Sequence, residues 1–176
     1  MKDIMIDVET LGTAPGSVVT QIGAVYFDRD TGELGSEMLV NLNIDDCLNA
    51  GLVVDGGSLK FWFDQPRENA SFTKNAVPLT KGLQTLRDFY DGKALVWSHA
   101  TFDFPILHSA YRAIGQKLCF PYRNLRDIRT LVDLSNRPFT KDKDGDPKNH
   151  NGLDDCKYQV KYCVECFNIL RAGRPV

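Results

Sequence analysis

The chain has 176 residues, of which 43% are hydrophobic and 25% are charged, values typical of a soluble globular protein with one sizeable core. Its formal net charge is −2, so any contact with nucleic acid must be local or mediated by cations. No apolar run reaches the length of a membrane span, and the first residues lack the pattern of a signal peptide. We therefore expect a single domain over residues 1–176 in a cytoplasmic setting.

Two carboxylates dominate the first twelve residues. Between Ile4 and Glu9, aliphatic residues alternate with Asp7 and Glu9, a pattern that predicts a buried strand with both carboxylates on one face. No Lys or Arg stands between Lys2 and Arg29 to neutralise them locally. Buried carboxylates at close range repel each other unless they are protonated, hydrogen-bonded or bridged by hard cations such as Mg²⁺ or Mn²⁺. The alternative is a solvent-facing pair at the end of an edge strand.

The remaining elements predict a three-stranded antiparallel meander followed by mixed helix and strand. Further strands are expected at residues 18–27, 38–44 and 94–97. Helices are expected at 58–65 with Ser58 as cap, at 80–90 with Thr80 as cap, and at 105–114, 126–134 and 153–170. Residues 136–149 are rich in charge and helix breakers and predict a flexible loop. The fold class is therefore a single α/β domain.

Five unevenly spaced cysteines argue against a disulfide framework and for reduced thiols. Cys163 and Cys166 form a CxxC pair, but they lie in a helical pattern and no second CxxC completes a zinc site. We interpret them as buried helix cysteines.

Two further acidic positions are candidates for a site. Asp103 follows the expected fourth strand, where carboxylates of open α/β sheets often gather, although it could instead cap the next helix. His150 precedes Asp155 by five residues at the start of the last helix, where Asp154 and Asp155 could merely complement the helix dipole. Periodicity does not separate Asp154 from Asp155.

Taken together, these motifs resemble the DnaQ-like DEDDh family of 3′-to-5′ exonucleases, whose fold is ribonuclease H-like. The family's Asp-x-Glu motif is matched by Asp7 and Glu9, its second Asp by Asp103, and its His-x4-Asp motif by His150 and Asp155. The segments 102–107 and 126–130 are similar to phage exodeoxyribonucleases of the DexA kind. The resemblance implies a mixed sheet, with the antiparallel meander beside parallel strands and helices around it.

The resemblance also implies a two-metal mechanism. Two Mg²⁺ ions, which Mn²⁺ could replace, would be held by the four carboxylates, with Asp7 as the bridge between them. His150 would act as the general base on the attacking water, and its place after the 136–149 loop suggests that it closes over a bound 3′ end. Substrate contacts fall to Thr10, Leu11 and Phe102, although the sequence after Glu9 departs from the family's usual Thr-Thr-Gly-Leu.

The expected reaction is hydrolysis from the 3′ end of single-stranded nucleic acid, releasing nucleoside 5′-monophosphates, with DNA favoured over RNA. Three alternatives remain open: an exoribonuclease of the same family, a catalytically silent nucleic-acid-binding domain, and a metal phosphoesterase for small substrates. No membrane partner is expected. Some relatives form homodimers, and a phage origin would place the protein in the host cytoplasm.

Several other side chains have weaker indications. Phe61, Trp62 and Phe63 could stack bases, but aromatic residues at helical spacing are more often part of a core. Asp127 is interpreted as a helix-start residue or as a support for the site. Plausible phosphate contacts, which the sequence does not rank, are Arg123, Arg126, Lys141, Lys143 and Lys148.

Overall fold

A mixed five-stranded sheet, in the order β3-β2-β1-β4-β5, forms the centre of the molecule. The computed structural model describes residues 1–138 and 150–173, apart from the side chain of Glu68. The strands are β1 (Asp3–Thr10), β2 (Val19–Phe27), β3 (Leu34–Asn41), β4 (Leu95–Ser98) and β5 (Leu125–Asp127). Strands β1, β2 and β3 form the antiparallel meander, whereas β4 runs parallel to both β1 and β5. This arrangement confirms the predicted fold class.

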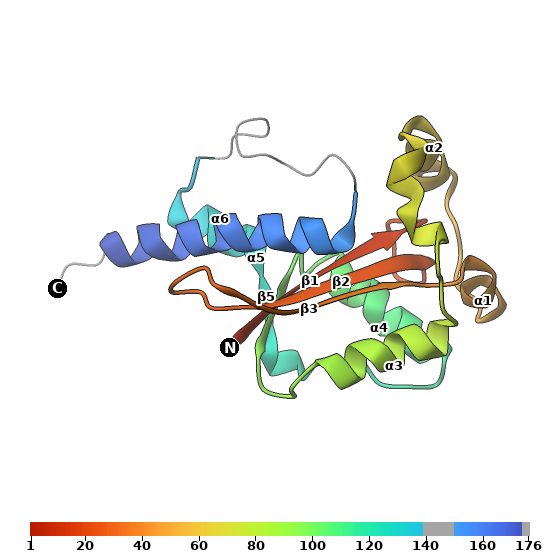
Figure 1. The fold of residues 1–176 in the computed structure, drawn as a ribbon, viewed down its shortest axis with the longest axis horizontal. Coiled ribbons are helices and arrows are strands. Elements are labelled where there is room, and N and C mark those ends of the chain that lie inside the picture. The colour runs from red at the N-terminus through yellow and green to blue at the C-terminus, as the bar shows by residue number, and fades with distance from the viewer. Residues whose placement is uncertain (139–149, 174–176) are drawn as a thin grey trace.

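Helices cover both faces of the sheet (Figure 1). They are α1 (Ile44–Asn49), α2 (Gly56–Asp64), α3 (Leu79–Phe89), α4 (Asp103–Ala113), α5 (Ile128–Ser135) and α6 (Gly152–Ala172), with 3₁₀ segments η1 (Arg67–Thr73) and η2 (Tyr122–Asn124). The long α6 crosses one face, and α3 and α4 lie against the other. No helix in the described residues is both long and apolar enough to cross a membrane.

The alternation in β1 separates two hydrophobic cores. Ile4, Ile6 and Val8 are buried on the face covered by α3 and α4. Met5 is buried on the opposite face, among residues of α5 and α6. Asp7 and Glu9 share the face of Met5, which brings both carboxylates beneath α6.

Two expected helix caps were wrong. Asp55, not Ser58, caps α2, because its Oδ1 accepts a hydrogen bond of 2.8 Å from the Ser58 amide. Helix α3 begins at Leu79, directly after Pro78, and the Leu79 amide donates a hydrogen bond of 2.6 Å to Oδ2 of Asp46, so Thr80 lies inside the helix. In each case the helix starts earlier than expected, because Asp55 and Pro78 occupy the cap positions.

Two boundaries also differ from the prediction. The third strand begins at Leu34 and ends at Asn41, and Ile44 starts the short helix α1, which Asn43 caps through the Asp46 amide. Arg126 belongs to β5, which parallel pairing with β4 defines and no local pattern indicated. The expected loop falls mostly on residues 139–149, outside the described residues. The cysteines are free thiols, and Cys163 and Cys166 are buried as predicted.

The first turn of α6 lies directly on the sheet at Gly23, which is the partner of Asp7 in the β1–β2 ladder. A Cβ atom at Gly23 would lie 2.2 Å from the carbonyl oxygen of Gly152, so only glycine allows this approach. The Gly152 amide also donates a hydrogen bond of 2.7 Å to Oε1 of Gln21. These contacts fix the start of α6 over the middle of β1.

We predict that Gly23→Ala lowers the free energy of unfolding by about 1–3 kcal/mol, because the added methyl group pushes α6 away from β2. Urea-induced unfolding measures this change. Gly56→Ala is the matched control, since nothing lies within 4 Å of a Cβ atom at that position. Equal unfolding midpoints for the two variants would contradict the prediction.

Candidate functional site

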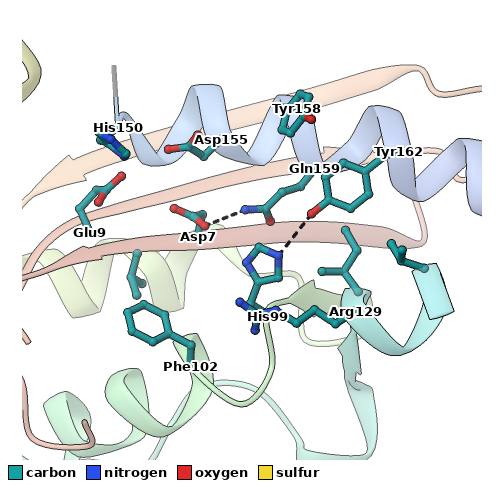
Figure 2. A pocket seen from close by; sticks show the side chains of 13 residues that line it. Asp7, Glu9, His99, Phe102, Arg129, His150, Asp155, Tyr158, Gln159 and Tyr162 are labelled. Carbon is teal, nitrogen blue, oxygen red and sulfur yellow. Dashed lines mark hydrogen bonds between the residues drawn. The ribbon is translucent and has the colours of Figure 1, made fainter. Parts of the chain in front are cut away.

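Carboxylates from distant parts of the chain meet above β1. Carboxylate oxygens of Asp7, Glu9 and Asp155 all lie within 4.8 Å of one another. Figure 2 shows Asp155 on α6 facing the two side chains of β1. Asp155 therefore belongs to the cluster, whereas its neighbour Asp154 does not.

The fourth acidic residue, Asp103, lies below this group at the start of α4. It is only 1% exposed, and its Oδ1 accepts a hydrogen bond of 3.2 Å from the Val8 amide. Its Oδ2 is buried without a hydrogen-bond partner. Phe102 occupies the cap position of α4 and no side chain caps the helix, so Asp103 does not serve as the cap. One oxygen of Asp103 lies within 4.8 Å of ligand atoms of Asp7 and His99.

Asp7, Glu9 and Asp155 lie at two adjoining clefts, whereas the buried Asp103 lines neither. The first cleft has a volume of about 680 Å³ and the second about 460 Å³. The residues shared by both are Val8, Glu9, Phe102 and His150. The His150 ring lies edge-on to Phe61, with 5.0 Å between ring centroids, and its backbone adopts a positive φ of 45°. His150 therefore stands between the carboxylates and the aromatic residues of α2.

The predicted substrate contacts fall in different places. Thr10 and Phe102 line the second cleft, together with Phe61 and Trp62 of α2. Leu11 is 5% exposed in the apolar core and lines neither cleft, so its contact with a base stays a prediction without support from its position.

The other weakly indicated side chains also separate. Phe63 is 81% exposed and lines neither cleft. Arg123 and Arg126 lie outside both clefts, and Arg126 donates to the carbonyls of Arg123 and Leu125. Asp127 caps α5, as its interpretation as a helix-start residue predicted. The three lysines fall outside the described residues.

Sequence reasoning missed five polar residues of the first cleft: His99, Arg129, Tyr158, Gln159 and Tyr162. Gln159 donates a hydrogen bond of 2.7 Å to Asp7, and His99 Nε2 lies 3.3 Å from the Tyr162 hydroxyl (Figure 2). Arg129 is the one Arg or Lys among the described residues that line this cleft. For Gln159, helical spacing from Asp155 was an available signal; the others required the fold.

Burial and mutual repulsion raise the pKa values of these carboxyl groups. The pKa of Asp7 is well above its usual range because of burial and the nearby Asp103, and burial raises the pKa of Asp103 to about 7. Burial, then Asp7 and Asp155, raise the pKa of Glu9 to about 9. Asp3, on the same strand face, is instead paired with Arg29 and accepts a hydrogen bond of 2.8 Å from Trp97 Nε1.

This set of groups fits hard divalent cations. Every acidic donor is an oxygen, the group has excess negative charge, and the buried Oδ2 of Asp103 has no partner. Asp7 belongs to both groups of possible ligands, which supports the expectation that it bridges two ions.

We predict that divalent cations stabilise the protein more at high pH. The pKa of Glu9 rises on folding from 4.5 to about 9. Protonated Glu9 therefore contributes its full share to the stability of the folded protein below pH 4.5, and this contribution is lost as the pH rises through about 9. Cations oppose this loss by binding the ionised form. At 100 times its Kd, one bound ion adds about 2.7 kcal/mol, or about 5–10 °C in Tm.

Thermal denaturation with and without Mn²⁺, at about pH 6 and about pH 8.5, tests this prediction. Glu9→Gln should raise the Tm of the metal-free protein at the higher pH and reduce the effect of Mn²⁺. A Mn²⁺ effect that is equal at both pH values would contradict it.

Comparisons with known proteins agree with this geometry. The model of the 3′-5′ exoribonuclease Rv2179c-like domain matches residues 2–167. None of the curated proteins matches the chain. Exonuclease I from Methylocaldum szegediense is similar in structure, with a TM-score of 0.68 and 16% identity, over 97% of this chain and 43% of that one. E. coli exonuclease I in complex with a dT13 oligonucleotide has a TM-score of 0.66 and 14% identity, over 98% of this chain and 44% of that one.

This chain thus spans less than half the length of these exonuclease I chains, and at these identities the likeness shows the fold. The match to the family model extends from the first strand to the last helix, and it therefore includes every carboxylate of the cluster. The predicted resemblance to DnaQ-like DEDDh exonucleases is confirmed, and the chain belongs to the 3′-5′ exoribonuclease Rv2179c-like domain family.

Proposed function

We propose that this protein is a 3′-to-5′ exonuclease that uses divalent cations to release nucleoside 5′-monophosphates from single-stranded ends. The observation that supports it most directly is the group of carboxylates at Asp7, Glu9, Asp103 and Asp155, in which Asp7 lies within 4.8 Å of the ligand atoms of each of the other three. When bound, two divalent cations supply charge neutralisation for the phosphodiester and lower the pKa of the attacking water. Mg²⁺ is the ion we expect, with Mn²⁺ as its substitute.

RNA is the substrate that the family description favours. The similarity to phage exodeoxyribonucleases favoured DNA, and the E. coli exonuclease I structure contains a DNA oligonucleotide. The family match covers far more of the chain than the short phage-like segments, so we propose RNA first and include DNA in the test.

The second cleft supports a place for the terminal nucleotide. Phe61 offers an aromatic face that is 43% exposed, which suits stacking of a base. Phe102 lies between the two clefts and can separate the terminal nucleotide from the rest of the strand. In the first cleft, Arg129 is placed to attract phosphates of that remaining strand.

His150 is the better candidate for the general base. It lines both clefts and is only partly buried, so it can reach a water molecule beside a bound phosphate. His99 is the rival, but burial and the nearby Arg129 lower its pKa to about 4, and its Nε2 already lies near Tyr162. A base with so low a pKa accepts protons poorly at neutral pH.

We expect matched 5′-labelled RNA and DNA oligonucleotides to be shortened stepwise from the 3′ end in Mg²⁺, with RNA cut faster. EDTA and Asp7→Ala should abolish the ladder, because each removes the cations or their bridging ligand. Gel analysis measures the products. A small phosphodiester such as a nucleotide p-nitrophenyl ester provides the comparison for the phosphoesterase alternative. Faster turnover of the small ester, or no cleavage of either oligonucleotide, would refute the proposal.

We expect His150→Ala to lower kcat by a factor of about 10²–10⁴, because the attacking water loses its proton acceptor. The exposed His108 on α4 lies outside both clefts, and His108→Ala is the matched control. Single-turnover rates across a range of pH values measure the effect. An unchanged rate in His150→Ala, with a large loss in His99→Ala, would transfer the role to His99.

A further inference from the structure

Gln159 connects α6 to the carboxylate that both ligand groups share. It lies one helical turn after Asp155 on the same face of α6. Its Nε2 donates to Oδ1 of Asp7 at 2.7 Å, and the contact is drawn in Figure 2. The side chain is only 4% exposed, so water competes little for this bond.

The chemistry of an amide suits this place. Its N–H group holds one oxygen of Asp7 and leaves the other oxygen free to bind a cation. A Lys or Arg in the same position would bring a positive charge and compete with the cation, whereas the neutral amide does not. When Asp7 is ionised to bind a cation, the reverse orientation would place the amide oxygen against a carboxylate oxygen, so the donor faces Asp7.

Packing of α6 fixes the position from which Gln159 reaches Asp7. Cys156, Val160 and Cys163, which flank Gln159 on α6, are all buried in the core beneath the helix. The amide Oε1 of Gln159 is buried without a hydrogen-bond partner, which disfavours the folded state. An apolar residue would avoid this cost, so the gain from a glutamine here must come through Asp7.

We propose that Gln159 is a positioning residue that holds Asp7 in the orientation needed to bind divalent cations. The inference depends on the proposed function for its link to catalysis, but not for its effect on cation binding. Helix α6 then has two roles, because Asp155 supplies a ligand and Gln159 orients another.

Gln159→Met tests this inference, because methionine has a similar length but no donor. We expect the Kd for Mn²⁺ to rise by a factor of about 10–100, measured by isothermal titration calorimetry on the protein alone. We also expect kcat to fall while KM for the oligonucleotide stays within about twofold, because substrate contacts are intact. The exposed Gln84 on α3 provides the control, Gln84→Met, which should leave both quantities unchanged.

Gln159→Asn repeats the test with an amide that is too short to reach Asp7, and we expect the same loss of affinity. A Kd for Mn²⁺ within about twofold of wild type in either folded variant would overturn the inference, even if Tm falls, since Gln159 would then be only structural. If the affinity for Mn²⁺ falls in the Gln159 variants but the wild-type protein degrades no oligonucleotide, the proposed function is refuted and this inference stays intact.

Discussion

The position of α6 depends on a backbone contact between two glycines. Gly23 in β2 and Gly152 at the start of α6 approach closely, and any shift of the helix relative to β2 would break this contact. Because Gly23 pairs with Asp7 across the β1–β2 ladder, the helix begins directly above that carboxylate. One contact thus unites the first strand with the last helix, and a site built from both ends of the chain can form.

The site concentrates like charges at a cost in stability. The same face of β1 shows how such a charge can be neutralised, because Asp3 is buried in an ion pair with Arg29. Asp7 and Glu9, further along the strand, have no such partner in the part of the chain that the structure describes. A cation-binding centre requires this difference, since an internal guanidinium would occupy the place of the ion. Stability given up at a functional site is a general feature of enzymes.

Local sequence patterns predicted the parts of the molecule that local physics decides. The alternation around Asp7 gave the strand and its carboxylate face, and the stripe containing Cys156 gave the last helix. Strand β5 was missed because three residues contain no usable period, and only pairing with β4 defines it. Similarly, Asp55 rather than Ser58 caps α2, a choice between two good cap residues that sequence alone did not resolve.

The site followed the same rule. The four carboxylates and His150 came from motif order. The structure brings Asp7, Glu9, Asp155 and His150 to one pair of clefts, and the buried Asp103 lies within 4.8 Å of Asp7. The contributions of His99 and Arg129 depend on where the β4–α4 connection and α5 meet in space, so no spacing along the chain could indicate them. Leu11 was expected to contact substrate because it follows a motif; its burial in the core gives that prediction no support.

The two walls of the second cleft differ in how firmly they are attached. One wall is β1, in the centre of the sheet, whereas α2 has no buried residue. Trp62 connects α2 to β1 through a hydrogen bond of 2.9 Å to the Thr10 carbonyl. Segments with little buried surface open locally at a lower free energy than the sheet, so we expect the amides of α2 to exchange with solvent before those of β1. We therefore expect the carboxylates of β1 to keep their positions on the sheet when the aromatic wall formed by α2 opens.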